Sequence, residues 1–568
     1  MRTKKSTFLM LFKYQLFFFY FTAVYQSLCF LFNVSGFVGL RNSFYYTLIW
    51  LIPILIFQKH SKKIAFVIGV FLWLASLPSL FYFLIYKQEF SQSVIYIIFE
   101  SNIVESNEFL HTYFSWWMIP FFIIYTLIGY IIWKKLSNIS IKLTGKIILI
   151  PILLLIASES FAKSYVLGNS NFDSSIERQM TKMQCATPWN IVFGYVSYKK
   201  VLDNMEKLLS KNSTLPPVKN LVDNSPSVNT VVLVIGESTD RNRMSLYGYK
   251  RDTTPNLDKM KDDLIVFKNV YSPRPYTIEV LEQALTFGDE LHPDMYLKKV
   301  NIINIMKQAG YETYWITNQQ TQTKRNTMLT TFSKIADHQV YLNNNRRQNS
   351  SSYDEVVLKP FKKVLADKKV KKKFIVVHLL GTHSRYDYRY PDNFNKFTNR
   401  KVSDKLNEKE TESYNAYDNA VYYNDYVVSN LIKSVKNEKT TASLLYLSDH
   451  GEEVFDDIDK KKMGRNEYAP TKAMYTIPFI LYGNEKYKEN NNYKKLKSLT
   501  KRYFTSADLL YTFSDFAKLK YDSLDLSKSI ISDKFVQHPV LIGDPTNKKT
   551  LRDLIKKPFV YKKIKIQS

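Results

Sequence analysis

The first 165 residues of the chain are dominated by long apolar runs, which short charged loops separate. A bilayer core about 30 Å thick needs about 20 helical residues to cross it, and most of these runs approach that length. Tryptophan and tyrosine gather near the ends of the runs, as they do at membrane–water interfaces. The pattern predicts five transmembrane helices, the second and fifth of them short: Tyr14–Phe32, Phe44–Phe57, Ile64–Tyr86, Trp116–Trp133 and Ile147–Phe161.

The charges of the loops predict the orientation of this membrane domain. One side carries two cations, Arg41 and Lys87, and four glutamates, whereas the other side carries ten cations. Since cytoplasmic loops are enriched in lysine and arginine, we expect a cytoplasmic N-terminus and, after five crossings, export of the rest of the chain. The first run is long and lacks a small-residue cleavage site, which favours an uncleaved anchor over a signal peptide. The ten cations are Arg2, Lys4, Lys5, Lys59, Lys62, Lys63, Lys134, Lys135, Lys142 and Lys146.

A segment of intermediate character follows the membrane domain. Part of Ser170–Leu209 has the pattern of an amphipathic helix, which lies either on the bilayer surface or against the next domain. Lys211–Ser227 contains three prolines and is typical of a linker. We therefore expect three parts: a transmembrane domain over 1–165, interfacial helices and linker over 166–227, and an exported domain over 228–568.

Beyond residue 228 short β-rich runs alternate with helical stretches such as Ile278–Phe287 and Tyr414–Lys436. The β-rich runs are mostly continuous and apolar, which is typical of parallel strands covered on both faces. This predicts an α/β domain with a mostly parallel sheet, whose ligands bind at the carboxyl ends of the strands. The predicted strands are Thr230–Ile235, Tyr314–Thr317, Phe374–Leu379, Ser443–Leu447 and Ile477–Leu481.

Composition and charge narrow the class of protein. The 568 residues include 79 Lys+Arg and 51 Asp+Glu, a net charge of +28, and a hydrophobic content of 45% excludes a disordered chain. A net positive charge of this size favours binding to nucleic acid or to an anionic membrane surface. Because the chain has a predicted membrane domain, we expect a membrane partner and no nucleic acid. The two cysteines, Cys29 in the first apolar run and Cys185 outside the membrane, exclude a disulfide framework and a cysteine-rich zinc site.

Ionisable side chains follow three of the predicted strands. Glu237 follows the first strand, His383 follows the third, and Asp449 and His450 follow the fourth. Carboxylates and imidazoles suit a divalent metal, most simply zinc. Taken singly each has an ordinary explanation, such as a helix cap or a surface charge, and we interpret His378, which lies within the third strand, as a core histidine. The combination predicts a metal site.

Thr277 is the candidate nucleophile. It follows a rigid Pro-rich approach, Ser272–Tyr276, and opens a helical stripe of Ile278, Leu281 and Leu285. The pattern predicts that Thr277 is a helix N-cap, where free N–H groups and the macrodipole favour an anion such as phosphate. Capping alone is the simpler interpretation, because a threonine hydroxyl is a poor nucleophile unless a metal lowers its pKa.

The motifs in combination resemble the phosphoethanolamine transferases of the alkaline phosphatase and sulfatase superfamily. The five-helix anchor before an exported domain is also similar, so the resemblance covers nearly the whole chain. The context Pro275–Ile278 resembles the branch that modifies the lipopolysaccharide core more than the lipid A branch. The motifs are Val234–Ser238 with Arg241, Leu246–Tyr249 and Thr253–Leu257, then His378-x-x-Gly-x-His383, then Ser448–Glu452.

This resemblance implies a fold and a site. The fold is an α/β/α sandwich, exported to the periplasm behind a multi-pass anchor in the bacterial inner membrane. Thr277 would be the nucleophile and His383 would contact the phosphoryl group. One zinc ion is expected, and its implied ligands are Glu237, Thr277, Asp449 and His450.

The resemblance also implies a reaction. Phosphatidylethanolamine would donate phosphoethanolamine and release diacylglycerol, leaving a phospho-threonine intermediate. The acceptor would be a lipopolysaccharide, at a core sugar or at lipid A. Glu105, with Ser101 nearby, matches a lipid-side substrate-binding stretch of the family.

The chain departs from the family in two respects. Lipid A-type members carry disulfides in the exported domain, and their absence from this chain favours the core branch. Those members also have a histidine downstream of Asp-His-Gly, whereas Met463–Glu467 contains none. Either Asn466 or Arg465 takes part of that role, or the phosphate site is built differently, so a second metal position stays open.

Three other functions match parts of the pattern. Lipoteichoic acid synthases have five helices and an outer domain of the same superfamily, and transfer glycerol phosphate through a threonine. A sulfatase would need a Cys/Ser-x-Pro-x-Arg motif, which the chain lacks. A non-catalytic scaffold binding anionic glycans would not need the intact set Glu237, Thr277, Asp449 and His450.

Overall fold

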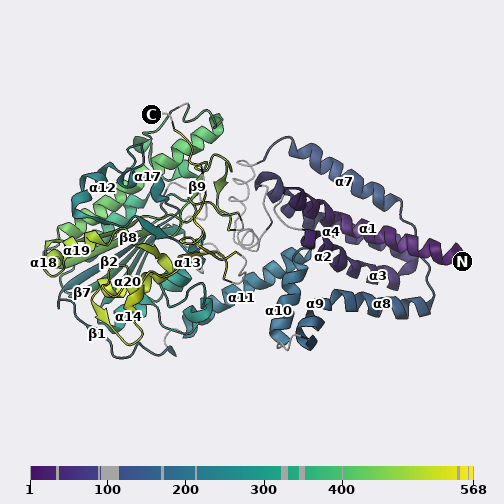
Figure 1. Cartoon of the computed structure of the whole chain (residues 1–568), viewed down its shortest axis with the longest axis horizontal. Helices are drawn as coiled ribbons and strands as arrows, with labels where there is room; N and C mark the ends of the chain where they lie inside the picture. The colour runs from purple at the N-terminus through teal and green to yellow at the C-terminus, as the bar shows by residue number, and fades with distance from the viewer. Residues whose placement is uncertain are drawn as a thin grey trace. The chain divides into compact units, whose positions relative to one another are not determined.

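The computed structural model divides the chain into two compact units, Met1–Leu202 and Asp203–Ser568. Figure 1 traces both along the chain. The boundary falls inside the segment that we expected to join the two domains. The described residues are 2–32, 37–86, 90, 114–167, 172–211, 214–320, 331–343, 352–399, 401–467, 469–545, 550–560 and 562–566.

The first unit is helical, and each predicted apolar run contains helix. Phe8–Leu31 and Gln58–Ile85 are long and apolar enough to cross a membrane, and Leu143–Ala157 with Glu159–Val166 adds a third span if this pair, bent by 61°, counts as one. The helices are α1 (Arg2–Leu31), α2 (Phe37–Thr47), α3 (Leu51–Ile56), α4 (Ser61–Tyr86), α7 (Met118–Lys134), α8 (Leu143–Ala157), α9 (Glu159–Ala162), α10 (Phe172–Met183) and α11 (Trp189–Lys211). The N-terminal part is thus a helical membrane domain, and the count of five crossings stays a prediction.

The second predicted span is divided between α2 and α3 by a 3-10 turn, Leu48–Trp50. Pro53 lies in α3 and has no N–H to donate to the carbonyl group of Ile49, so a continuous helix would lose a hydrogen bond there. This accounts for two short helices in place of one long span.

The segment after the membrane helices packs on them around residues 185–190. Gln26 donates to the carbonyl oxygen of Cys185 (2.8 Å), and Asn190 donates to Ser79 Oγ (2.9 Å). The rings of Trp50 and Trp189 stack with centroids 5.8 Å apart. This part of the expected interfacial segment is therefore anchored to α1 and α4.

The second unit is built on a seven-stranded sheet with strand order β3-β11-β8-β2-β7-β5-β6. Strands β8, β2, β7, β5 and β6 form a parallel set, whereas β11 runs antiparallel to β8. All five predicted strands form, but the last is not parallel. The strands are β2 (Asn229–Gly236), β3 (Ile265–Val266), β5 (Glu312–Gln320), β6 (His338–Asn343), β7 (Lys372–His378), β8 (Thr441–Ser448) and β11 (Phe479–Gly483).

Helices cover both faces of this sheet, as the sandwich prediction requires. Ile375 of β7 belongs to one core cluster with residues of α16 (Leu358–Ala366) and α17 (Glu408–Lys436). The preceding residue, Phe374, points to the opposite face of the sheet and contacts Phe513 of α20 (Leu509–Phe516), with ring centroids 5.2 Å apart. Every residue of β2 is buried, so its apolar run is explained by cover on both sides.

Shorter elements complete the domain around the sheet. The remaining helices are α12 (Pro255–Lys259), α13 (Thr277–Ala284), α14 (Ile302–Gln308), α18 (Glu485–Glu489) and α19 (Tyr493–Ser498). The two-residue strands β9 (Glu453–Val454) and β10 (Met463–Gly464) pair antiparallel beside the carboxyl end of β8. The other short strands are β1 (Val222–Asp223), β4 (Asn269–Tyr271), β12 (Tyr503–Thr505), β13 (Leu519–Lys520), β14 (Leu541–Ile542) and β15 (Arg552–Asp553).

Candidate active site

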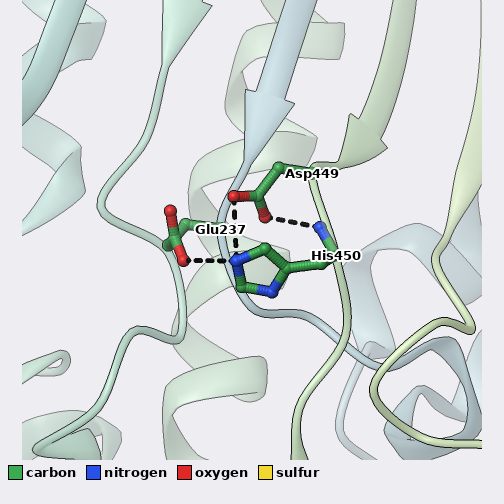
Figure 2. Close-up of side chains that lie close together, drawn as sticks. All are labelled: Glu237, Asp449 and His450. Carbon is green, nitrogen blue, oxygen red and sulfur yellow. Dashed lines mark hydrogen bonds and ion pairs between the residues drawn. The ribbon is translucent and has the colours of Figure 1, made fainter. Parts of the chain in front are cut away.

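Three ionisable side chains meet at the carboxyl ends of two neighbouring strands. Glu237 directly follows β2, and Asp449 and His450 directly follow β8. The register pairs Gly236 with Ser448, so the residues after them emerge side by side. Figure 2 shows the three side chains pointing toward one another. The expectation that these three side chains meet at the strand ends is confirmed, and their role as metal ligands stays a prediction.

The spacing of their polar atoms fits a metal ion. His450 Nε2 lies 3.3 Å from Glu237 Oε1 and 3.2 Å from Asp449 Oδ2, and the three ligand atoms all lie within 4.8 Å of one another. Ligand atoms about 2.0–2.2 Å from a tetrahedral zinc ion lie about 3.4 Å apart. The observed separations match that distance.

Neighbouring groups orient these side chains toward a common point. Asp449 Oδ1 accepts hydrogen bonds from the backbone N–H groups of Ser238 (3.0 Å) and His450 (2.7 Å). The other oxygen, Oδ2, is buried and accepts no hydrogen bond within the described part of the chain. His450 Nδ1 donates to the carbonyl oxygen of Gly451 (3.0 Å), so Nε2 carries the lone pair that can accept a hydrogen bond or bind a cation. A buried carboxylate oxygen without a hydrogen bond, facing the lone pair of an imidazole nitrogen, is an arrangement that a cation completes.

The pKa shifts of Glu237, Asp449 and His450 also favour a bound cation. Burial opposes the charge of Glu237, but His450, then His383 and Arg465, hold its pKa well below the usual value. Burial and the charge of Glu237 raise the pKa of Asp449 well above its usual value. Burial and the charge of Arg465 lower the pKa of His450 to about 4, so the imidazole is neutral at pH 7, the form that binds metals. Two carboxylates this close ionise together when a cation neutralises them.

The hydroxyl group of Thr277 joins this cluster. Thr277 Oγ1 donates to Glu237 Oε2 (2.9 Å) and lies 3.3 Å from His450 Nε2. Thr277 is the first residue of α13, and the N-cap is Tyr276, which makes no side-chain capping bond. The N-cap prediction was therefore wrong by one residue. The hydroxyl faces Glu237 and His450 of the candidate metal site instead of the backbone of its own helix.

Two glycines allow the backbone to pack closely behind the ligands. A Cβ atom on Gly381, which has a φ of +57°, would lie 2.6 Å from the carbonyl oxygen of Glu237. A Cβ on Gly451 would lie 2.0 Å from the carbonyl oxygen of Ala473. Asp354 holds the loop at Gly381 by accepting the N–H groups of Leu380 (2.9 Å) and Gly381 (2.7 Å). The close approach of the Gly381 loop thus fixes the position of the Glu237 backbone.

The other described residues singled out in the sequence lie outside the group of Glu237, Asp449, His450 and Thr277. His383 is buried on the loop after β7, close enough for its charge to lower the pKa of Glu237, and Ser384 Oγ lies 3.3 Å from its Nδ1. His378 is a buried core histidine, as interpreted from the sequence: its ring packs edge-on against Trp315, and burial lowers its pKa to about 4. Glu105 and Ser101 lie outside the described residues.

The structure separates the two candidates for the role of the missing downstream histidine. The Arg465 guanidinium enters the site, with NH1 3.5 Å from Glu237 Oε1 and within hydrogen-bonding reach of His450 Nε2. Asn466 is turned toward its own loop, where its Oδ1 accepts the N–H of Ala469 (3.2 Å). Arg465 therefore contacts the site directly.

Sequence reasoning missed Gln319 and the part played by Glu452. Gln319 Nε2 donates to the carbonyl oxygen of Leu379 (2.7 Å) and lies 3.4 Å from Glu237 Oε2. Glu452 Oε2 lies 3.1 Å from Arg465 Nε. Gln319 lies near the carboxyl end of β5, so the rule that pointed to Glu237 would have found it had the predicted strand reached beyond Thr317.

The sandwich fold and this cluster define a membrane-anchored enzyme of the alkaline phosphatase and sulfatase type. The sulfatase family model matches residues 229–519. Phosphoethanolamine transferase EptC of Escherichia coli (strain K12) is 44% identical over 551 residues, which cover 96% of this chain and 95% of that protein. The chain belongs to the phosphoethanolamine transferase family of the sulfatase superfamily, and it is a phosphoethanolamine transferase.

One solved structure supports this assignment, and a second supports the fold. The C-terminal periplasmic domain of EptC from Escherichia coli, in complex with zinc, is 49% identical, with a TM-score of 0.58, and the match covers 61% of this chain and 98% of that one. The integral membrane protein lipooligosaccharide phosphoethanolamine transferase A from Neisseria meningitidis is 17% identical with a TM-score of 0.62, covering 92% of this chain and 97% of that one. The second likeness shows the fold, a helical membrane domain followed by a sulfatase-like domain.

Proposed function

We propose that this transferase depends on zinc and moves phosphoethanolamine from phosphatidylethanolamine to a lipopolysaccharide acceptor, a core sugar or lipid A. The group passes through a phospho-threonine intermediate on Thr277. The observation that carries the proposal is the position of Thr277 Oγ1, 2.9 Å from Glu237 Oε2 and 3.3 Å from His450 Nε2. A hydroxyl that only capped a helix would face its own backbone.

The residues that would hold the zinc ion are Glu237, Thr277, Asp449 and His450. Their separations, the unsatisfied Asp449 Oδ2 and the neutral His450 support this assignment. When bound, zinc supplies Lewis acidity, which lowers the pKa of a hydroxyl and offsets the charge of phosphoryl oxygens. One site is proposed, because the described residues contain one such cluster.

Each side chain of the site has a separate role in the proposed reaction. Glu237 Oε2 accepts the hydroxyl proton of Thr277 in a hydrogen bond, which turns a lone pair of Oγ1 toward an incoming phosphorus atom. In the first displacement the Oγ1–P bond forms, the P–O bond to diacylglycerol breaks, and the proton ends on the released diacylglycerol oxygen. In the second, an acceptor hydroxyl attacks the same phosphorus, the acceptor O–P bond forms as the Oγ1–P bond breaks, and the acceptor's proton ends on Thr277 Oγ1. His383 would contact the phosphoryl group during both steps.

The donor and acceptor follow from the family and from the motif around Thr277. Family membership supports phosphoethanolamine as the group that is moved, over the glycerol phosphate of lipoteichoic acid synthases and over a scaffold role. The resemblance of Pro275–Ile278 to the core-modifying branch supports a lipopolysaccharide acceptor. Glu105 is proposed as a contact for the lipid substrate.

The proposed location is the bacterial inner membrane, with a cytoplasmic N-terminus and a periplasmic catalytic domain. The EptC domain of Escherichia coli is described as periplasmic, and the loop charges support the same side here. We keep the three-part division into 1–165, 166–227 and 228–568 as a proposal. A periplasm-dependent reporter fused after residue 165 should be active, and a cytoplasmic reporter there should be silent.

Mass spectrometry of the lipopolysaccharide from cells with and without the protein tests the function. The protein should add phosphoethanolamine to the lipopolysaccharide and raise diacylglycerol, and fragmentation should assign the modified sugar. The Thr277→Ala variant is the control, and it should add none. Glycerol phosphate on the acceptor, or no change in any glycolipid, would contradict the proposal.

A further inference from the structure

The loop that follows β2 contains a serine in the left-handed region of backbone conformation. Ser238 comes directly after Glu237 and has a φ of +58°. A residue with a Cβ atom adopts this conformation at a free-energy cost, so the surrounding structure has to hold it there. Both residues are buried. A strained residue next to a candidate metal ligand suggests that its conformation serves the site.

Ser238 contacts both carboxylates of the candidate metal site. Its backbone N–H donates to Asp449 Oδ1 (3.0 Å), and its Oγ donates to Glu237 Oε1 (2.7 Å). The second oxygen of Glu237, Oε2, accepts the hydroxyl of Thr277 (2.9 Å). A change in φ rotates the side chain of a residue relative to its N–H group. The left-handed conformation of Ser238 is therefore the one that serves both carboxylates at once.

The hydroxyl group of Tyr417 bridges the backbone on the other side of this serine. Tyr417 lies on α17 and is fully buried. Its Oη donates to the carbonyl oxygen of Ser238 (2.7 Å) and accepts from the backbone N–H of Asp240 (2.9 Å). Its ring packs edge-on against Tyr386, with centroids 5.1 Å apart. The packed ring fixes the hydroxyl, and the hydroxyl fixes two peptide groups of the loop.

We propose that Tyr417 is a positioning residue, which keeps Ser238 in its left-handed conformation by bridging it to Asp240. Ser238 in turn holds the carboxylates of Glu237 and Asp449 in the orientation that binds a cation. Loss of a group that orients metal ligands typically lowers metal affinity 10–100-fold. The proposal rests on the proposed function only for zinc as the cation.

Zinc affinity of the full-length protein in detergent, measured by competition with a chelator, tests the proposal. Tyr417→Phe keeps the ring and its packing on Tyr386 and removes only the hydroxyl. The loop then loses its bridge, and Ser238 can leave the strained conformation. We expect this variant to bind zinc at least about tenfold more weakly than the wild type.

Tyr493→Phe is the matched control for the loss of a bridging hydroxyl. Tyr493 Oη accepts the backbone N–H of Gly483 (3.2 Å) and donates to the carbonyl oxygen of Asp263 (2.9 Å), so it also bridges two backbone groups. Gly483 pairs with Ser443, near the start of β8, whereas Asp449 follows the end of that strand. The control should lose stability as Tyr417→Phe does, but it should bind zinc like the wild type.

A glycine substitution separates positioning from a merely structural role. Glycine adopts a positive φ without strain, so Ser238→Gly has less need of the Tyr417 bridge. Ser238→Gly alone should weaken zinc binding severalfold, because Glu237 loses a hydrogen bond. Adding Tyr417→Phe to Ser238→Gly should then change zinc affinity by about twofold or less. A tyrosine with only a structural role would lower the affinity by the same factor in both backgrounds.

Hydrogen exchange of the metal-free protein gives a readout that does not depend on zinc. In Tyr417→Phe the N–H of Asp240 loses its acceptor, so the peptide that spans residues 236–241 should exchange faster than in the wild type. Tyr493→Phe should leave this peptide unchanged. If Tyr417→Phe does not fold, the double variant with Ser238→Gly decides, since relief of the strain should restore folding.

Four outcomes overturn the proposal. They are zinc affinity of Tyr417→Phe within twofold of the wild type, an equal loss of affinity in Tyr493→Phe, an equal loss in the Ser238→Gly background, and failure of both Tyr417→Phe and the double variant to fold. Failure of the proposed function looks different. A wild type that binds no zinc would refute the cofactor, while faster exchange of residues 236–241 in Tyr417→Phe would still support the positioning role and unchanged exchange would refute it.

Discussion

Thr277 Oγ1 donates a 2.9 Å hydrogen bond to Glu237 Oε2, although 40 residues separate the two in the sequence. One residue follows a central strand and the other opens α13. Both side chains are buried. A buried hydroxyl aimed at a carboxylate of the candidate metal site suits the proposed role of Thr277 as the nucleophile.

Thr277→Ala should lower lipid hydrolysis and transfer by more than about a thousandfold, because the attacking oxygen is lost. Stability should change by only about 1 kcal/mol, the net contribution of one hydrogen bond. Thr277→Ser keeps the oxygen and should retain measurable turnover. Diacylglycerol release by the purified variants measures these effects. Near-normal turnover by the alanine variant would show that the threonine is not the nucleophile.

Removal of zinc should lower the melting temperature of the protein, and readdition should restore it. Saturation at about a hundred times the dissociation constant stabilises a protein by about 2.7 kcal/mol. Asp449→Asn should lose most of this zinc-dependent gain, yet the metal-free variant should be at least as stable as the metal-free wild type, because Asp449 no longer faces the Glu237 charge. The exposed Asp404→Asn is the control and should respond to zinc like the wild type. An equal zinc response in Asp449→Asn would remove it from the ligand set.

Gly381→Ala should damage the site as well as the fold. The new Cβ would meet the carbonyl oxygen of Glu237 at 2.6 Å, so the Glu237 backbone has to move. Gly310→Ala is a matched control, because Gly310 has a φ of +82° and a Cβ added there would meet nothing within 4 Å. The control should lose about 1 kcal/mol from backbone strain and keep its zinc affinity. Gly381→Ala should lose more stability and bind zinc more weakly, which denaturation and zinc titration measure.

The sequence carried enough information for the strands but not for all their directions. All five predicted strands form, because each is a continuous apolar run buried on both faces. The last of them, β11, runs antiparallel to β8. A run of buried apolar residues has the same pattern in either direction, so this feature depends on how the chain returns to the sheet.

The site was predictable where it depends on strand ends, and less so where it depends on long-range packing. Glu237, Asp449 and His450 directly follow strands that pair in register, so the pattern sufficed. The orientation of the Thr277 hydroxyl depends on which strand end faces α13. The place of Arg465 depends on the pairing of two strands of two residues each, too short to give a sequence signal.

The stability of the second unit, Asp203–Ser568, should fall with rising pH through the titration of Glu290. This side chain is 6% exposed, and its burial, with the charges of Asp508 and Asp289, raises its pKa to about 8. Because the folded protein favours the protonated form, the stability is present below the usual carboxyl pKa and is lost as pH rises toward 8. The neutral Glu290→Gln should remove this loss, which is at most about 1.4 kcal/mol per pH unit. Melting curves at about pH 4 and about pH 9, on either side of this range, should differ less in the variant, and an unchanged difference would contradict the assignment.

The central claim is that Thr277 carries the phosphoethanolamine group between donor and acceptor. The most direct measurement is peptide mass spectrometry of the zinc-loaded wild-type protein, incubated with phosphatidylethanolamine in the absence of acceptor. The account predicts phosphoethanolamine on the peptide that contains Thr277, its disappearance when acceptor is added, and its absence from Thr277→Ala. Sustained transfer with an unmodified Thr277 peptide, or the group on another residue, would contradict it.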